Sequence, residues 1–347
     1  MGDAPPLRSI AAEETLDRVE RIAVLRALPA LGDMICAVPA LRTLRRRYPG
    51  ARIALVGLWS GRWMLDAYPA YLDELLPIDG LPLLCPPPSD LEGALAALAA
   101  ARRQRFDLAI QLQDDGPLSN LVTAMLGART CLVHYRPGQP LPEGAIAVRY
   151  SDRGHEVVRL LELVDELGYA GEAHLEPPHP ATQAAGMRLV DDLGLTRTGF
   201  AVVHPGAAAV ERRWSVDGFA SVAGWLLGLG LAVVATGVEA EHDLVDRLRR
   251  RQPAVVDLCG RTSITDLAGV LSRARLVVSN NTGVAHLAAA VRAPSVVVFL
   301  GEDPGRWAPL DSARHRVVPL SHHPQDIDGE LAAVLEAVAQ QLNRFPT

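Results

Sequence analysis

The order of buried strands and helices is the feature that most limits how this chain can fold. Residues 21–28, RIAVLRAL, are rich in branched apolar side chains, which predicts a buried strand. After a turn that contains proline and glycine, a helix is expected over residues 34–48, ended by Pro49 and Gly50. Residues 52–58 then predict a second buried strand. Strand, turn, helix and strand in this order form a βαβ unit, which favours a parallel sheet.

The same alternation continues through the chain and restarts after residues 168–180, a stretch rich in proline and glycine that we interpret as an interdomain linker. Further strands are expected over residues 106–112, 129–134, 200–204, 231–236, 254–258, 275–278 and 295–300. Further helices are expected over residues 60–67, 91–103, 119–127, 155–167, 182–193, 216–227, 241–251, 264–272 and 324–342. The pattern predicts an α/β protein with two facing Rossmann-like domains and mainly parallel sheets.

Four segments follow from this pattern. Residues 1–20 are expected to be a flexible tail, residues 21–172 the first domain and residues 173–323 the second domain. Residues 324–347 are expected to form a C-terminal helix that could cross back to the first domain. A length of 347 residues also favours two domains, because it exceeds what one ordinary core accommodates.

Composition excludes several classes of protein. With 49% apolar and 21% charged residues the chain is typical of a globular protein, and a net charge of −6 argues against a nucleic-acid binder. Cys36, Cys85, Cys131 and Cys259 show no close pair, so they indicate neither a zinc motif nor a disulfide framework. The N-terminus lacks the apolar core of a signal peptide, and no apolar stretch is long enough to span a bilayer. We therefore expect a cytoplasmic protein.

The sequence VVSNNTGVAHL, residues 277–287, predicts a strand that turns directly into a helix. The amide groups and the positive dipole end at such a helix start favour an anion. His286 lies four residues after Thr282, so both side chains are expected on one helical face near that anion. The arrangement suits a diphosphate. An ordinary capped helix with a buried histidine explains the stretch equally well, and the residues alone leave both interpretations open.

Asp33 follows Gly32 near the end of the first strand, where a helix begins. A carboxylate at a helix N-terminus is stabilised as the anion, which suits a general base that faces the cleft between the domains. A plain helix-capping role is the alternative, and without further context it is the commoner one.

Other polar and glycine residues follow strands of the second domain, at the sheet edge where ligands bind in open α/β folds. These candidates are His204, Gly206, Arg212, Thr236, Gly237, Glu241 and Thr262. Arg212 suits a bidentate phosphate contact, although it and Arg213 could instead form a solvated basic pair beside Trp214. Glu241 could accept a hydrogen bond from a sugar hydroxyl or merely cap a helix. The sequence shows no GxGxxG, P-loop or HExxH motif and no metal-ligand cluster, so no metal and no cofactor are expected.

Four ordered stretches together resemble glycosyltransferase family 9, the ADP-heptose:lipopolysaccharide heptosyltransferase family. They are residues 21–57, 202–237, 258–301 and 303–309. The resemblance implies a GT-B fold, with the acceptor bound by the first domain and the nucleotide sugar by the second, and an inverting single displacement. By motif position it implies that Asp33 is the catalytic base, Arg212 a donor-phosphate contact and Glu241 a donor-ribose contact. Asn281, Thr282, Gly283 and His286 take the position of the donor diphosphate and sugar.

The chain departs from the family pattern in two places. Asn281 stands where the family usually has aspartate, which bears on the choice of donor sugar. The loop between Arg26 and Gly32 is about one residue longer than usual, on the acceptor side of the expected base. Arg26, Gly32 and Gln113 are the candidate acceptor-binding residues.

The expected reaction transfers a sugar, heptose from ADP-heptose, to a hydroxyl of a glycan or lipid-linked acceptor. A sugar-nucleotide epimerase and a non-catalytic nucleotide-sugar binding protein stay open as alternatives, whereas a nicotinamide oxidoreductase is disfavoured by the missing fingerprint. Four arginines of the first long helix, Arg42, Arg45, Arg46 and Arg47, suggest peripheral contact with the inner membrane surface. A solvated helix face is the favoured interpretation of these arginines. A monomer is expected.

Overall fold

The computed structural model describes residues 16–81, 90–197, 199–321 and 327–346. The chain divides into two compact units, Met1–Ala173 and His174–Thr347. Most of the expected N-terminal tail, Cys85 with the prolines that follow it, and the first residues of the expected C-terminal helix lie outside the described residues.

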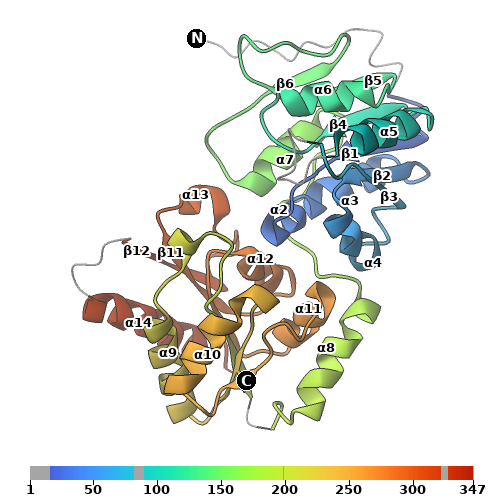
Figure 1. The fold of residues 1–347 in the computed structure, drawn as a ribbon. Coiled ribbons are helices and arrows are strands. Elements are labelled where there is room, and N and C mark those ends of the chain that lie inside the picture. The colour runs from blue at the N-terminus through green and yellow to red at the C-terminus, as the bar shows by residue number, and fades with distance from the viewer. Residues whose placement is uncertain (1–15, 82–89, 198, 322–326, 347) are drawn as a thin grey trace. The chain divides into compact units, whose positions relative to one another are not determined.

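The described part of the first unit contains a six-stranded parallel sheet (Figure 1). In spatial order its strands are β3 (Glu74–Pro77), β2 (Arg52–Gly57), β1 (Arg21–Leu25), β4 (Leu108–Gln111), β5 (Thr130–Tyr135) and β6 (Ile146–Arg149). The helices are α2 (Leu31–Cys36), α3 (Val38–Arg47), α4 (Trp63–Ala67), α5 (Leu91–Arg102), α6 (Leu118–Met125) and α7 (Glu156–Asp165), with the 3₁₀ turn η1 (Trp59–Arg62).

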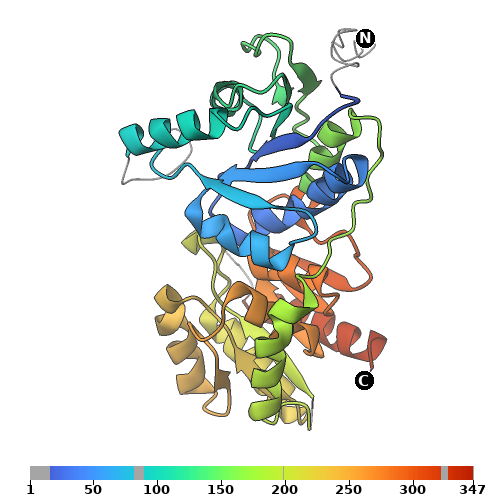
Figure 2. The same ribbon diagram turned by 90° about the vertical axis from the view of Figure 1, so that its right-hand side faces the viewer.

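Alternation along the strands of the first unit supplies two apolar faces, as a sheet covered on both sides requires. Ala23 and Leu25 of β1 pack with Leu98 of α5 and Val122 of α6 in one buried cluster. On the other face α7 packs against α2, α3 and β5. The short loops after β1, β2 and β4 lead into helical segments at the carboxyl ends of these strands (Figure 2).

The second unit repeats this topology in its described residues. Its parallel sheet has the order β12 (His315–Leu320), β11 (Ser295–Leu300), β10 (Leu276–Asn280), β7 (Phe200–His204), β8 (Ala232–Ala235) and β9 (Val256–Asp257). The helices are α8 (Pro180–Asp192), α9 (Val216–Gly228), α10 (His242–Arg251), α11 (Ile264–Ser272), α12 (Gly283–Ala290), α13 (Pro304–Trp307) and α14 (Ile327–Arg344), with the 3₁₀ turns η2 (Val210–Arg212) and η3 (Glu239–Glu241).

Two layers of helices cover the second sheet. Val296 and Val298 of β11 belong to the cluster that holds Phe219 of α9 and Val334 of α14, whereas Val297 and its face pack on α12. Helices α8 and α11 lie side by side, and α11 also contacts α12 (Figure 1). Helix α14 packs on β10, β11, β12 and α9 of its own unit. Its expected return to the first domain stays a prediction.

The secondary structure confirms most of the expected elements. Strands β7 and β11 and helix α11 have the bounds expected from the sequence, and most other elements differ by one to four residues at an end. Three strands were not expected: β3, β6 and β12. Each of them is an edge strand that pairs with a single neighbour. Because an edge strand carries partly exposed side chains, its sequence lacks the continuous apolar run of a central strand.

The single helix expected over residues 34–48 is wrong. The chain instead forms α2 and α3, separated at Ala37, and Pro39 lies in the first turn of α3. Proline has no amide hydrogen, so it is tolerated at the start of a helix and not in its interior. Consequently Asp33 lies in the first turn of α2 and is not its capping residue, which is Ala30.

The interpretation of the four helical arginines as a solvated face is also wrong, except for the exposed Arg46. Arg42 is buried and donates to the carbonyl oxygen of Glu172. Arg45 pairs with Asp73 at 2.6 Å, and Arg47 Nε donates to the carbonyl oxygen of Leu167 at 3.1 Å. These side chains hold α3 to its own unit. In the part of the chain that the structure describes, no helix combines the length and the hydropathy needed to cross a membrane.

Candidate functional site

Both sheets reverse their strand order at one internal position, between β1 and β4 in the first unit and between β7 and β10 in the second. The loops after two such strands leave toward opposite sides, which opens a crevice at the carboxyl ends where ligands of doubly wound folds bind. In the first unit Asp33 lies in the first turn of α2, which follows β1, and Gln113 follows β4. In the second unit Arg212 lies in η2, which follows β7, and Asn281 follows β10. The structure therefore places candidate residues at the switch point of each unit.

Asp33 is held in place through hydrogen bonds to its main-chain carbonyl oxygen. Arg26, only 1% exposed, donates from Nε and Nη2 to the carbonyl oxygen of Asp33 at 3.1 and 2.6 Å. Its Nη1 donates to the carbonyl oxygen of Leu112, the residue that follows β4. The Asp33 carboxylate lies 3.9 Å from Arg26 Nη2 and its side chain is 24% exposed. Asp33 is thus fixed in position while its carboxylate stays reachable.

The other polar groups at this switch point also brace the loop after β1. The amide of Ala27 donates to Gln113 Oε1 at 2.6 Å, and Gln113 is itself oriented by Gln111. Gly32 is buried in α2. Arg26 and Gln113, expected to bind an acceptor, make these hydrogen bonds with the backbone of their own unit. Nearby, burial raises the pKa of the Cys36 thiol, which keeps it protonated and unreactive.

In the second unit Asn280 joins the two loops of the switch point, a role that the sequence did not reveal. Asn280 is fully buried at the end of β10, and its Nδ2 donates to the carbonyl oxygens of Pro205 and Gly206 at 2.9 and 3.2 Å. Its Oδ1 accepts from the amide of Trp214 at 2.8 Å. One side chain therefore fixes both ends of the loop that carries Arg212. The only sequence signal was its place beside Asn281.

The two arginines of this loop differ in their contacts. Arg213 Nε donates to the carbonyl oxygen of Ala207 at 2.8 Å, within its own loop. Arg212 is 47% exposed, and its Nη2 lies 3.1 Å from Glu302 Oε1. Glu302 follows β11 and also accepts a hydrogen bond from Asn281 Nδ2. The structure thus brings Arg212 and Asn281 together through Glu302, a residue that was absent from the expected site.

The strand-to-helix turn after β10 has the expected form. Thr282 is the capping residue of α12, and its Oγ1 accepts from the amide of Val284 at 3.2 Å. Gly283 begins the helix. His286 is 3% exposed, and its ring lies 6.3 Å from that of Trp307, edge to face. The capped helix and the buried histidine of the alternative interpretation are both present, and the positive end of α12 lies at the switch point.

A third group of candidates lies around Glu241. Its Oε2 accepts from the amide of Val238 at 2.9 Å and closes η3, so the carboxylate does cap a turn. A Cβ atom on Gly206 would lie 2.1 Å from Glu241 Oε1, and one on Gly237 would lie 3.2 Å from Oε2. The absence of a side chain at position 206 thus leaves room for the Glu241 carboxylate in its present place.

His204 and Thr236 end the neighbouring strands β7 and β8. His204 Nδ1 lies 3.0 Å from Thr236 Oγ1. Burial lowers the pKa of His204, against the opposing effect of the Glu241 charge, so the ring is neutral at pH 7. Thr262 is half-buried before α11, whose cap is Ser263.

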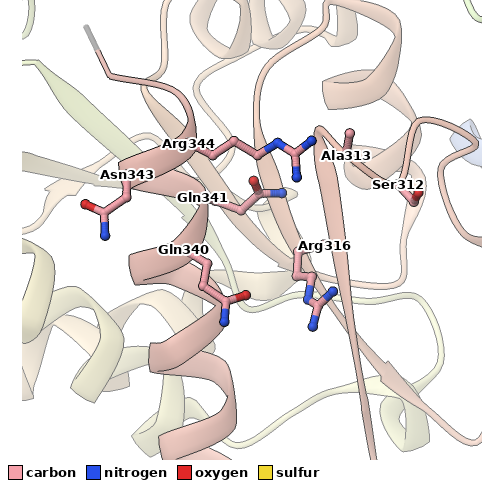
Figure 3. A pocket seen from close by; sticks show the side chains of 7 residues that line it. All are labelled: Ser312, Ala313, Arg316, Gln340, Gln341, Asn343 and Arg344. Carbon is pink, nitrogen blue, oxygen red and sulfur yellow. The ribbon is translucent and has the colours of Figure 1, made fainter.

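One clear hollow of the second unit lies away from these loops. It measures about 470 Å³ and lies between the end of α14 and the start of β12 (Figure 3). It is lined by Ser312, Ala313, Arg316, Gln340, Gln341, Asn343 and Arg344. Because the strands are parallel, the start of β12 belongs to the opposite edge of the sheet from Asn281. Among the described residues no group of three or more metal-ligating side chains lies together.

Comparison with known proteins agrees with this geometry. The family model of glycosyltransferase family 9 (heptosyltransferase) matches residues 95–328, more than half of the chain. Lipopolysaccharide heptosyltransferase 3 of Escherichia coli (strain K12) is 24% identical over 304 residues, which cover 80% of this chain and 82% of that protein.

Two solved structures show the fold. A family 9 glycosyl transferase from Veillonella parvula DSM 2008 is 19% identical, with a TM-score of 0.75 over 93% of this chain and 97% of its own. The ADP-heptose LPS heptosyltransferase II of Escherichia coli is 21% identical, with a TM-score of 0.72 over 94% of this chain and 99% of its own. The expected GT-B fold is confirmed.

Proposed function

This chain belongs to glycosyltransferase family 9 (heptosyltransferase), and on that premise we propose that it transfers heptose from ADP-heptose to a glycan hydroxyl. The chain is therefore an enzyme that transfers a sugar. The names of the similar proteins, which include an ADP-heptose LPS heptosyltransferase, support heptose as the sugar and ADP as the leaving group. A place in lipopolysaccharide synthesis follows from the same names.

The observation that carries the proposal is that the loops after β7 and β10, at the switch point, and the loop after the neighbouring β11 come together. Asn280 fixes the first of these loops, and Glu302 connects Arg212 with Asn281. The positive end of α12 and the guanidinium of Arg212 are the two groups that would bind a diphosphate. Glu241, beside the loops after β7 and β8, is the proposed contact for the donor ribose.

The proposed chemistry is an inverting single displacement. An acceptor hydroxyl oxygen attacks the anomeric carbon, its proton passes to the Asp33 carboxylate, and the bond from that carbon to the ADP oxygen breaks. Negative charge develops on the ADP, where Arg212 and the start of α12 stabilise it. The partial exposure of Asp33 and its anchored main chain support the role of base. The step uses no cofactor and no metal.

The acceptor is proposed to be a glycan or a lipid-linked glycan bound by the first unit, with Gly32 and the loop after β1 nearest to it. We place the reaction in the cytoplasm, at the inner membrane surface, and expect a monomer. Because Arg42, Arg45 and Arg47 are engaged within the unit, Arg46 is the arginine of α3 left for such a surface.

Incubation with ADP-heptose and other nucleotide sugars, with and without a glycan acceptor, tests the proposal. Mass spectrometry then separates transfer, hydrolysis and epimerisation. We expect acceptor-dependent transfer and ADP release in equal amounts. Altered sugar nucleotide without acceptor would establish the epimerase instead, and binding without turnover would establish a binding protein. Family membership favours transfer over both.

A further inference from the structure

Glu302 is the one carboxylate that contacts both Arg212 and Asn281 within the described structure. It follows β11 by two residues and is 15% exposed, whereas Asn281 after β10 is 6% exposed. Oε1 of Glu302 lies 3.1 Å from Arg212 Nη2, and Oε2 accepts from Asn281 Nδ2. The two oxygens of this carboxylate therefore contact Arg212, which the proposed function assigns to the donor, and Asn281, which takes a donor position by its place in the family motif.

The sheet brings the three side chains together. β10 and β11 are neighbouring strands, and the amide of Asn281 donates to the carbonyl oxygen of Val298 at 2.9 Å. Val298 lies in β11, the strand that Glu302 follows. The 3₁₀ turn η2 that carries Arg212 contacts β11. These backbone contacts fix the separation of the loops, so the side chains of residues 212, 281 and 302 meet without any change of backbone.

Folding stability does not explain the Arg212–Glu302 pair. Arg212 is half exposed, and an ion pair with such a partner contributes little to folding stability. The pair does fix two orientations. Glu302 limits where the flexible guanidinium of Arg212 can lie. Glu302 also accepts a hydrogen bond from the amide nitrogen of Asn281, so the amide oxygen of Asn281 points away from Glu302.

We propose that Glu302 is a positioning residue of the donor site, and that residues 281 and 302 together supply the single carboxylate that orients Arg212. This inference rests on the proposed function. A second carboxylate at residue 281 would draw the guanidinium away from a bound diphosphate. With no carboxylate at either residue, the guanidinium and the amide would lose their common partner. Moving the carboxylate from residue 302 to residue 281 should preserve the arrangement.

Four proteins test the proposal: the wild type, Asn281→Asp, Glu302→Gln and the double variant. ADP affinity is measured by titration calorimetry and kcat/KM by donor-dependent transfer. Asn281→Asp should weaken ADP binding about tenfold, because its added charge competes with phosphate. Glu302→Gln should keep ADP affinity within about threefold but lower kcat/KM about tenfold. The double variant should return both quantities to within about threefold of the wild type.

Additive effects, with the double variant worse than either single variant, would overturn the proposal, as would wild-type behaviour of Glu302→Gln. Glu211→Gln is the matched control, because it removes an exposed charge beside Arg212 in η2 and should change neither quantity. Thermal unfolding of each protein shows that it is folded. A second comparison leaves Glu302 intact: in an Arg212→Ala background, Asn281→Asp should no longer weaken ADP binding. An equal loss in that background also overturns the proposal.

The outcomes separate this proposal from the proposed function. A wild type that neither binds ADP nor transfers a sugar contradicts the function itself. A wild type that does both, combined with an unrescued double variant, contradicts only the role of Glu302.

Discussion

Arg26 donates two hydrogen bonds to the carbonyl oxygen of Asp33, at 3.1 and 2.6 Å, while its remaining Nη1 binds the carbonyl oxygen of Leu112. One buried guanidinium thus ties the loop after β1 to the end of β4. Its strongest contacts with Asp33 are made to the backbone, and the carboxylate lies farther away at 3.9 Å.

Asp33→Asn removes the proposed base and keeps the shape of the side chain. We expect transfer to fall by roughly a hundredfold or more, since a general base contributes about that much. Because the contacts of Arg26 with the backbone of residue 33 remain, the melting temperature should change little. ADP affinity, which depends on the second unit, should also be retained. The rate of single-turnover transfer with ADP-heptose is measured for the wild type and the variant. A near-normal rate in the variant would contradict the assignment of Asp33 as the base.

Arg26→Lys tests whether positioning of Asp33 matters separately from its chemistry. Lysine is a point donor without the planar fork, so it cannot satisfy the carbonyl oxygens of Asp33 and Leu112 together. We expect kcat to fall about tenfold and the protein to lose about 1–3 kcal/mol of stability from an unsatisfied buried carbonyl. The ADP dissociation constant should stay unchanged. A kcat equal to that of the wild type contradicts the positioning role.

The sequence predicts those parts of the fold and site that depend on local pattern. The central strands and the start of α12 after Thr282 follow from apolar runs and a capping residue, which act over a few positions, whereas the start of α2 before Asp33 does not. The edge strands β3, β6 and β12 could not be predicted from local pattern, because their burial comes from the neighbouring strand.

Contacts between loops could also not be predicted from the sequence. From the sequence, Glu302 is an ordinary carboxylate in a loop. Its role becomes visible only because β11 lies beside β10 and η2 contacts β11. Arg26 reads as a candidate ligand contact, and only its burial reveals that it anchors backbone. Such roles arise from strand order, which local patterns do not encode.

Arg212→Ala and Arg213→Ala should separate ligand binding from loop structure. Arg212 is half exposed and pairs with Glu302, so its loss should weaken ADP binding by about tenfold, the value of one charged contact. Arg213 donates to the carbonyl oxygen of Ala207 within the loop, so Arg213→Ala should lower the melting temperature more than it weakens ADP binding. Titration calorimetry and thermal unfolding measure both effects. Equal ADP affinity in the wild type and Arg212→Ala counts against a phosphate role.

Gly206→Ala should disturb the Glu241 carboxylate without touching any other candidate directly. A Cβ atom at residue 206 would lie 2.1 Å from Oε1, so the carboxylate must move or the loop after β7 must shift. We expect a loss of about 1–3 kcal/mol in stability, as overpacking of a filled site costs. ADP binding should weaken as well. Gly228→Ala, where nothing lies within 4 Å, is the matched control.

Two of the buried histidines, His134 and His315, predict part of the dependence of stability on pH. Burial lowers the pKa of His315 to about 4, with the Asp311 charge opposing and Arg314 and Arg292 adding to it. Burial likewise lowers the pKa of His134 to about 4. Unfolded histidine titrates near the ordinary value of 6.5, so between pH 6.5 and 4 the unfolded chain binds more protons than the folded one. Stability is therefore complete above pH 6.5 and is lost as the pH falls toward 4.

His315→Asn removes one of these titrations. Each buried histidine should lower the free energy of unfolding by up to about 1.4 kcal/mol per pH unit in this window. The variant, which also loses the contact between His315 Nδ1 and Ser295 Oγ at 2.9 Å, should be less stable than the wild type at pH 7.5. Its further loss of stability on going to pH 5 should be smaller, and smaller again when His134→Gln is added. Urea unfolding at both pH values measures these differences, and parallel losses in all three proteins would show that neither histidine carries the pH dependence.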